Sequence, residues 1–221
     1  MFKIIIQLTI LIYIIFVVYN LINLQKFNIN GVIIETIDIN DIKINSDLLN
    51  PVLTNDNNID FDINNINGYS QDINNYKNDY ANYVSKNKDL FEKLLKKEEV
   101  FNCNIFNDSH YYFPIQYSLS IISGSNSIPL KKCIHNKNII GILDGDVTIY
   151  LFNPKHKDEI VNKDNNMIKK WGHKKILQKG DILIIPPYWS YIQEINNKVI
   201  QYHIDVDTYF TFIPNYIKDN Y

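Results

Sequence analysis

The chain has 221 residues, of which 22 are basic and 24 acidic, and 46% of its residues are hydrophobic. This length accommodates one domain of ordinary size with an appendage. The net charge of -2 and the absence of arginine argue against a nucleic-acid partner, because phosphate and base recognition draws on positive charge and on arginine forks. The abundance of Asn, Ile, Lys and Tyr is typical of an AT-rich genome, such as that of a large DNA virus or a protist.

The first notable segment, residues 4–24, reads IIIQLTILIYIIFVVYNLINL and carries no charge. As a helix it would measure ~31 Å, close to the thickness of a bilayer core. It is apolar on every face, unlike a buried core helix, and no small residue suitable for signal cleavage occurs before Gly31. We therefore predict that residues 1–26 form a single-pass signal anchor in a viral, host or organellar membrane. This arrangement most simply places the following domain outside the cytosol.

Two segments separate the anchor from the main domain. Residues 27–67 are rich in Asn, Asp and Ile, and we expect a polar tether that adds one or two edge strands to the domain. Residues 68–110 are expected to flank the domain with helix. Within them, residues 83–100, YVSKNKDLFEKLLKKEEV, place Leu and Phe at helical spacing with lysines opposite, which predicts a helix packed on a sheet.

Residues 111–221 show a different pattern, in which short β-type runs alternate with turns. Examples are YYFPIQYSLSII, VTIYLF, DILIIP and VIQYHIDVDTYFTFI, and glycines such as Gly145 and Gly180 stand between runs. Strands at this density without helical periodicity between them predict an all-β sandwich or barrel.

The string GDILIIPPYWSY, residues 180–191, has a specific spacing. This spacing resembles that of the second motif of the cupin barrels and of the corresponding strand of JmjC-type 2-oxoglutarate oxygenases. The matching positions here are Gly180, Pro186, Tyr188 and Tyr191. The resemblance implies a cupin-type double-stranded β-helix, or jelly-roll, barrel with a few flanking helices. In those families position 188 is often Gly, and position 191 is a metal-binding histidine.

The upstream half, residues 118–154, resembles the stretch of JmjC-like proteins that carries the first two ligands. Its register places the family's His-x-Asp pair at Lys131 and Cys133, and the cupin glutamate at Asn138. The lysine that holds 2-oxoglutarate in some members falls at Val147. An active member of this family would use Fe(II) and 2-oxoglutarate.

The substitutions at these positions remove the chemistry that the family uses. A facial iron site needs two neutral imidazoles and a carboxylate, whereas Lys131 is a cation and Tyr191 is a phenol with an ordinary pKa near 10. We therefore predict a degenerate, non-catalytic barrel without metal or cofactor. Such a barrel would serve as a structural or interaction module for an unidentified protein or glycan.

A second interpretation is a metal-dependent enzyme whose ligands have moved. His203-Ile204-Asp205 is itself a His-x-Asp pair, and His135 or His173 could supply a third ligand. The competing reading is a solvated polar face of an antiparallel strand, with Tyr202, Ile204 and Val206 on the core face.

Two further features leave alternatives open. Trp171 and Trp189 could stack on a sugar, which gives a carbohydrate-binding barrel as a third reading, although Trp189 fits equally well in the core. Cys103 and Cys133 could pair in an oxidising compartment if their Cα atoms lie within about 7 Å.

Overall fold

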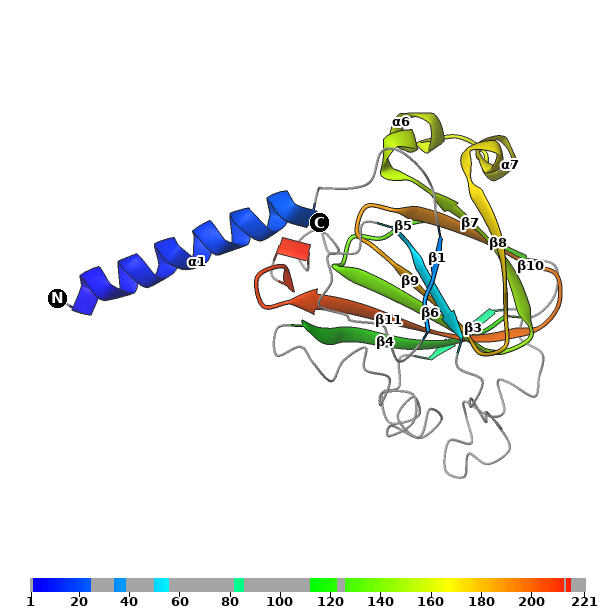
Figure 1. The fold of residues 1–221 in the computed structure, drawn as a ribbon, viewed down its shortest axis with the longest axis horizontal. Coiled ribbons are helices and arrows are strands. Elements are labelled where there is room, and N and C mark those ends of the chain that lie inside the picture. Colours follow the sequence, from blue (N-terminus) through cyan, green and yellow to red (C-terminus); the bar gives the residue numbers. More distant parts are fainter. Residues whose placement is uncertain are drawn as a thin grey trace, which may run out of the picture.

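The computed structural model describes residues 2–24, 34–38, 50–55, 82–85, 112–122, 126–212 and 214–215. Two β-sheets face each other as a sandwich, and one long helix at the N-terminus projects away from them (Figure 1). The predicted mainly-β class, with few helices, is confirmed.

The larger sheet, sheet A, has seven strands in the order β1-β2-β9-β6-β11-β4-β3. Its strands are β1 (Glu35–Thr36), β2 (Val52–Asn55), β3 (Asn82–Ser85), β4 (Tyr112–Ile122), β6 (Lys137–Asp144), β9 (Asp181–Ile185) and β11 (Val199–Thr208). The smaller sheet, sheet B, has the order β5-β10-β7-β8. Its strands are β5 (Asn126–Lys132), β7 (Asp146–Phe152), β8 (His173–Gln178) and β10 (Ser190–Ile195). All pairings are antiparallel except that of β1 with β2.

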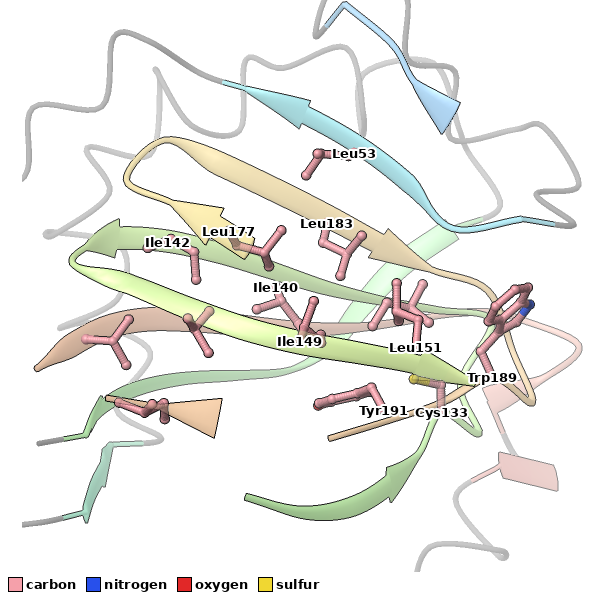
Figure 2. Close-up of a cluster of buried hydrophobic side chains, with 14 of the residues drawn as sticks. Leu53, Cys133, Ile140, Ile142, Ile149, Leu151, Leu177, Leu183, Trp189 and Tyr191 are labelled. Carbon is pink, nitrogen blue, oxygen red and sulfur yellow. The ribbon is translucent and has the colours of Figure 1, made fainter. Parts of the chain in front are cut away.

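The core lies between the two sheets and is built from β-branched and aliphatic side chains contributed by both (Figure 2). Strand alternation sets which residues enter it, because successive side chains point to opposite faces. On β10, Tyr191 belongs to this core, whereas its neighbour Ile192 belongs to a second cluster on the outer side of sheet B.

That second cluster is covered by the insertion between β7 and β8. The insertion consists of four short helical turns: η3 (Pro154–His156), α6 (Lys157–Ile160), α7 (Asn165–Ile168) and η4 (Lys169–Trp171). Side-chain caps start two of them, because Asn153 accepts a hydrogen bond from the Lys155 amide and Asp164 from the Asn166 amide. Ile160 and Ile168 from these turns pack on the sheet, so the lysine-rich insertion is anchored by apolar contacts.

Glycines occupy the turns that the sequence pattern predicted. Gly145, between β6 and β7, has φ +81°, and Gly180, between β8 and β9, has φ +91°. A Cβ atom at Gly145 would lie 2.2 Å from the carbonyl oxygen of Lys198, so the backbone of the neighbouring turn excludes a side chain there.

The N-terminal helix α1 comprises Phe2–Leu24, 23 residues, and its apolar side chains from Ile4 to Ile22 are largely exposed. It contacts the turn after β11: the Tyr13 hydroxyl donates to the carbonyl oxygen of Tyr209 over 3.1 Å, and the Phe16 and Phe210 rings stack with centroids 5.4 Å apart. Within the described ranges, no helix has both the length and the apolar character that a membrane crossing requires. The helix is confirmed, and the span stays a prediction.

The region between α1 and the main β domain differs in part from expectation. Two edge strands, β1 and β2, come from residues 27–67 and extend sheet A at one edge, as predicted. The helix predicted from Tyr83 is wrong at its start, because Tyr83 and Val84 belong to strand β3 and pair with β4. The pairing with β4 supplies backbone hydrogen-bond partners for β3, and this outweighs local helical spacing. Residues 86–100 lie outside the described part of the chain.

Candidate functional site

The end of β5 and the start of β10 bring the three predicted ligand positions together. Lys131 and Tyr191 are direct partners across the two strands. Just beyond, the Cys133 amide donates to the Trp189 carbonyl over 2.8 Å, and the Tyr188 amide donates to the Cys133 carbonyl over 2.7 Å. Cys133 and Tyr191 therefore enter the same inter-sheet core, where both are labelled in Figure 2. Their equivalence to the ligands of an iron enzyme stays a prediction.

The thiol and the phenol of this group are buried and neutral. Cys133 is 2% exposed and Tyr191 is 1% exposed. Burial raises the pKa of the Cys133 thiol well above its usual range; Lys131 opposes this shift, and the Asp205 charge adds to it. Burial also raises the pKa of the Tyr191 phenol, with Cys133 and Asp205 contributing. Both groups therefore keep their protons at neutral pH.

Strand β11 adds a row of polar side chains that faces the same interior. Gln201 and Gln193 of β10 exchange two amide hydrogen bonds of 3.0 and 3.1 Å across the space between the sheets. Two residues further along β11, burial lowers the pKa of His203 to about 3, and the Lys131 charge lowers it as well. The imidazole is therefore neutral at physiological pH. Its Nδ1 atom is buried without a hydrogen-bond partner among the described residues.

Asp205 is the carboxylate of this interior group. The Asn138 side-chain amide donates to the Oδ1 atom of Asp205. In the predicted register Asn138 stands where cupins have a glutamate. At this position the structure thus has an amide that is hydrogen-bonded to the Asp205 carboxylate. In the described part of the chain, the Oδ1 atom of Asn138 is buried and has no partner of its own.

His135, the third residue of the proposed relocated metal site, lies elsewhere. Its Nδ1 atom is 2.9 Å from the Oδ2 atom of Asp207, which is fully buried. Asp207 is four residues beyond His203 on the same strand, which corresponds to ~13 Å. The structure thus does not bring His135 to His203. Across the described ranges, no three His, Cys, Asp or Glu side chains are arranged to hold a metal ion.

Asp207 instead organises the end of β11. Besides His135, its carboxylate accepts hydrogen bonds from the Asn136 amide at 3.0 Å, the Asn215 side chain at 2.8 Å and the Thr211 hydroxyl at 3.2 Å. A buried carboxylate with this many donors ties the loop after β5 to the C-terminal turn. This role accounts for His135 and Asp207 without a metal.

The prediction that the polar side of β11 is a solvated face is wrong. Gln201 and Asp207 are 0% exposed, Asp205 is 8% exposed, and the opposite face, with Tyr202, Ile204 and Val206, is buried too. Strand β11 lies between β6 and β4 inside sheet A, and its polar side faces sheet B rather than water. Alternation of polar and apolar residues shows that two faces differ, but not which face meets the solvent.

The residues present do not fit an Fe(II) and 2-oxoglutarate site. A cation, a protonated thiol and a protonated phenol occupy the predicted ligand positions, where iron prefers imidazole and carboxylate. Val147, at the predicted position of the 2-oxoglutarate lysine, is fully buried in the apolar core and offers no counter-ion for a carboxylate.

The remaining candidate residues have different surroundings. Cys133 is a buried free thiol, and the predicted pairing with Cys103 stays a prediction, because Cys103 lies outside the described ranges. Trp189 is fully buried and cannot stack on a sugar from solvent. Trp171 is 39% exposed and lies against the His156 ring, with centroids 5.2 Å apart.

Sequence reasoning missed the Gln193–Gln201 pair. The available signal was the period of two on β10, because Gln193 shares a face with Tyr191, which the motif had already placed inside the barrel. An interior glutamine on one strand requires an interior partner, and Gln201 provides it.

No protein-family model matches the chain. No curated protein matches it either. Solved structures of cupin proteins do resemble it. A cupin superfamily protein of Desulfitobacterium hafniense is 15% identical, with 45% of this chain and 71% of that chain covered and a TM-score of 0.32. The cupin domain of Drosophila melanogaster CENP-C is 11% identical, with 40% and 59% covered and a TM-score of 0.30.

The ribosomal oxygenase YcfD of Escherichia coli also resembles this chain. It is 14% identical, with 43% of this chain and 23% of that chain covered and a TM-score of 0.34. Two of these three solved structures are cupin proteins by name, and cupins are the family that the sequence motifs resemble.

Proposed function

We propose that this chain is a membrane-attached, cupin-like module with a structural or interaction role, and that it is not an enzyme. One observation carries the proposal. The side chains at the predicted ligand positions, Lys131, Cys133 and Tyr191, come together at one end of the barrel as packing and surface groups rather than as metal donors.

The chemistry of these groups supports this reading. A thiol binds metal as the thiolate, and burial raises the pKa of Cys133 and so opposes loss of its proton. Burial likewise raises the pKa of the Tyr191 phenol, which opposes loss of its proton. The Lys131 charge, which acts on both Cys133 and His203, would repel a metal cation placed between them.

The test is the metal content and activity of the purified full-length protein. We expect substoichiometric iron, zinc and manganese by elemental analysis, and no consumption of 2-oxoglutarate in the presence of Fe(II) and oxygen. Metal retained at one equivalent per chain, together with consumption of 2-oxoglutarate, would overturn the proposal.

A second candidate, a metal enzyme with relocated ligands, rests on the unpartnered Nδ1 atom of His203. A buried neutral imidazole is a good metal ligand, and Asp205 follows it at the next inward position. A variant with His203→Gln separates the two candidates. If the wild-type protein binds a metal and this variant does not, the second candidate is favoured; equal metal content at background level supports the first.

Membrane attachment is proposed through residues 4–24 of α1. The apolar side chains along this helix are exposed, and water contact with so much aliphatic surface is unfavourable. We expect the full-length protein to stay in the membrane pellet after carbonate washing, whereas a variant lacking residues 2–24 should be released. Recovery of the full-length protein in the supernatant would contradict the attachment.

A further inference from the structure

A pocket of about 500 Å³ opens on the outer side of sheet B, separate from the barrel interior. It lies between the end of β5, the first helical turns of the insertion and the loop before β10. Strand alternation separates it from the interior group, because Tyr191 packs in the inter-sheet core and Lys131 is its cross-strand partner, whereas their neighbours Lys132 and Ser190 line this pocket. Its volume is within the range of ordinary small-molecule sites.

The walls of the pocket are mainly aliphatic. Leu130 of β5, Ile160 of α6 and Val161 contribute to them. Ile160 is held in the cluster under the insertion, which keeps this wall in place. Val161, in contrast, is 46% exposed, so apolar surface at this site remains uncovered by the described residues. An uncovered aliphatic wall in a concave site indicates an apolar ligand group.

The charge at the pocket has one sign. Lys132 and Lys157 both line it and both are exposed, and no acidic residue is among its described lining residues. The Lys132 ammonium group lies 5.4 Å from the ring centroid of Tyr188, which also lines the pocket. Lysine binds carboxylates and phosphates as a point charge. The electrostatics therefore favour an anionic group beside the aliphatic walls.

The backbone of Tyr188 provides an independent observation. Its φ is +67°, a left-handed conformation that is costly for a residue with a Cβ atom and that glycine adopts without cost. The cupin pattern often has glycine at this position. Its amide is held by the Cys133 carbonyl, and its side chain forms part of the pocket wall. Strained residues of this kind cluster at binding sites.

We propose that this pocket binds a single aliphatic chain that carries an anionic head group. The chain lies against Leu130, Ile160 and Val161, and the head group lies between Lys132 and Lys157. The head can be a carboxylate, as in a fatty acid, or a phosphate, as in a single-chain lipid phosphate. The proposal does not depend on whether the barrel interior holds a metal or on how α1 meets the membrane.

The experiment uses the full-length protein in nanodiscs and a dodecanoate probe that carries a diazirine in its chain. After photolysis and digestion at lysine, labelled peptides are mapped by mass spectrometry. Residues 158–163 and 180–198 report on the pocket, and residues 4–26, which include most of α1, report on nonspecific lipid labelling. Unlabelled dodecanoate, dodecyl phosphate and dodecyltrimethylammonium are compared as competitors.

We expect the pocket peptides to be labelled and protected by one or both anionic competitors, with the stronger competitor identifying the head group. The variant Lys132→Gln/Lys157→Gln should reduce pocket labelling at least tenfold relative to residues 4–26. Lys170→Gln/Lys174→Gln removes the same charge at exposed positions outside the pocket and should behave as wild type.

A second pocket variant provides an independent test in case the first variant does not fold. Val161→Glu changes an exposed side chain and introduces a carboxylate that should repel the head group, so it too should reduce pocket labelling. Three results would overturn the proposal: label confined to residues 4–26, equal protection by the cationic competitor, or unchanged labelling in both pocket variants.

Discussion

Lys131 and Tyr191 are direct cross-strand partners, yet Lys131 is exposed and Tyr191 is 1% exposed. The pair therefore marks the boundary between solvent and the core between the two sheets. The ammonium group of Lys131 reaches water, while its charge opposes the raised pKa of Cys133 and adds to the lowered pKa of His203 inside. An exposed cation beside a buried phenol is compatible with a packed end of the sandwich and unfavourable for a metal centre.

A metal site can be rebuilt if the register is right. The variant Lys131→His/Cys133→Asp/Tyr191→His should bind about one equivalent of Co(II), visible in its absorption spectrum, because the three positions converge on the interior. The matched control, Lys132→His/Cys133→Asp/Tyr191→His, moves one imidazole to the outer side of sheet B and should bind much more weakly. Equal binding by both variants, or none by the first in a folded state, would contradict the register.

The Cys133 thiol should be chemically inert in the folded protein. In a Cys103→Ser variant, Cys133 is the sole thiol, and we expect its reaction with a disulfide reagent at pH 8 to be at least a hundredfold slower than in urea. The reasons are its burial and the raised pKa of the thiol, which suppresses the thiolate. Val161→Cys in a background without Cys103 and Cys133 supplies an exposed reference. Equal native and unfolded rates for Cys133 would show that the site is open.

The Gln193–Gln201 pair should show strong coupling. Either single change to Ala leaves a buried amide without its partner, so we expect each to lower the free energy of unfolding by about 2 kcal/mol. The double change Gln193→Ala/Gln201→Ala removes both amides and should cost less than the sum of the single changes. Urea unfolding of the four proteins measures the coupling, and additive effects would argue against a direct pair.

His203 should make the fold less stable at acidic pH. Its pKa in the folded protein is about 3, against an ordinary value of 6.5, so below pH 6.5 the unfolded chain takes up a proton that the folded chain excludes. Stability is therefore lost as the pH falls from 6.5 toward 3, by at most about 1.4 kcal/mol per pH unit. Comparing wild type with His203→Leu isolates this contribution from the other histidines. Identical slopes in the two proteins would mean that His203 is protonated in the fold.

Truncation should show where the domain begins. A variant lacking residues 1–66, the predicted anchor and tether, also loses β1 and β2, and with them the buried Val52 and Leu53. Burial of each such side chain contributes about 1.5–3 kcal/mol, and the loss exposes the edge of β9. We expect this variant to melt at a lower temperature and to aggregate, whereas one lacking only residues 2–24 keeps the sheet. Equal melting temperatures would place β2 outside the stable domain.

Much of the fold could be predicted from local patterns. The period of two in residues 111–221 and the glycines between runs defined an all-β domain, because strand alternation and turns with positive φ are properties of short segments. The string from Gly180 to Tyr191 predicted a strand that ends at the two prolines, where β9 (Asp181–Ile185) lies. It also predicted that Tyr191 would lie near Lys131 and Cys133, which the pairing of β5 with β10 brings about.

Other features depended on contacts between different strands and loops. Whether the polar side of β11 met water or the other sheet was decided by Gln193, eight residues before Gln201, and by the position of β11 inside sheet A. His135 contacts Asp207 rather than His203, because the loop after β5 lies beside the end of β11 in the folded chain. Strand β3 formed where local spacing favoured helix, because β4 offered an open edge. Local periodicity specifies which residues share a face of a strand. Whether that face is buried or solvated depends on which other strands and loops pack against it.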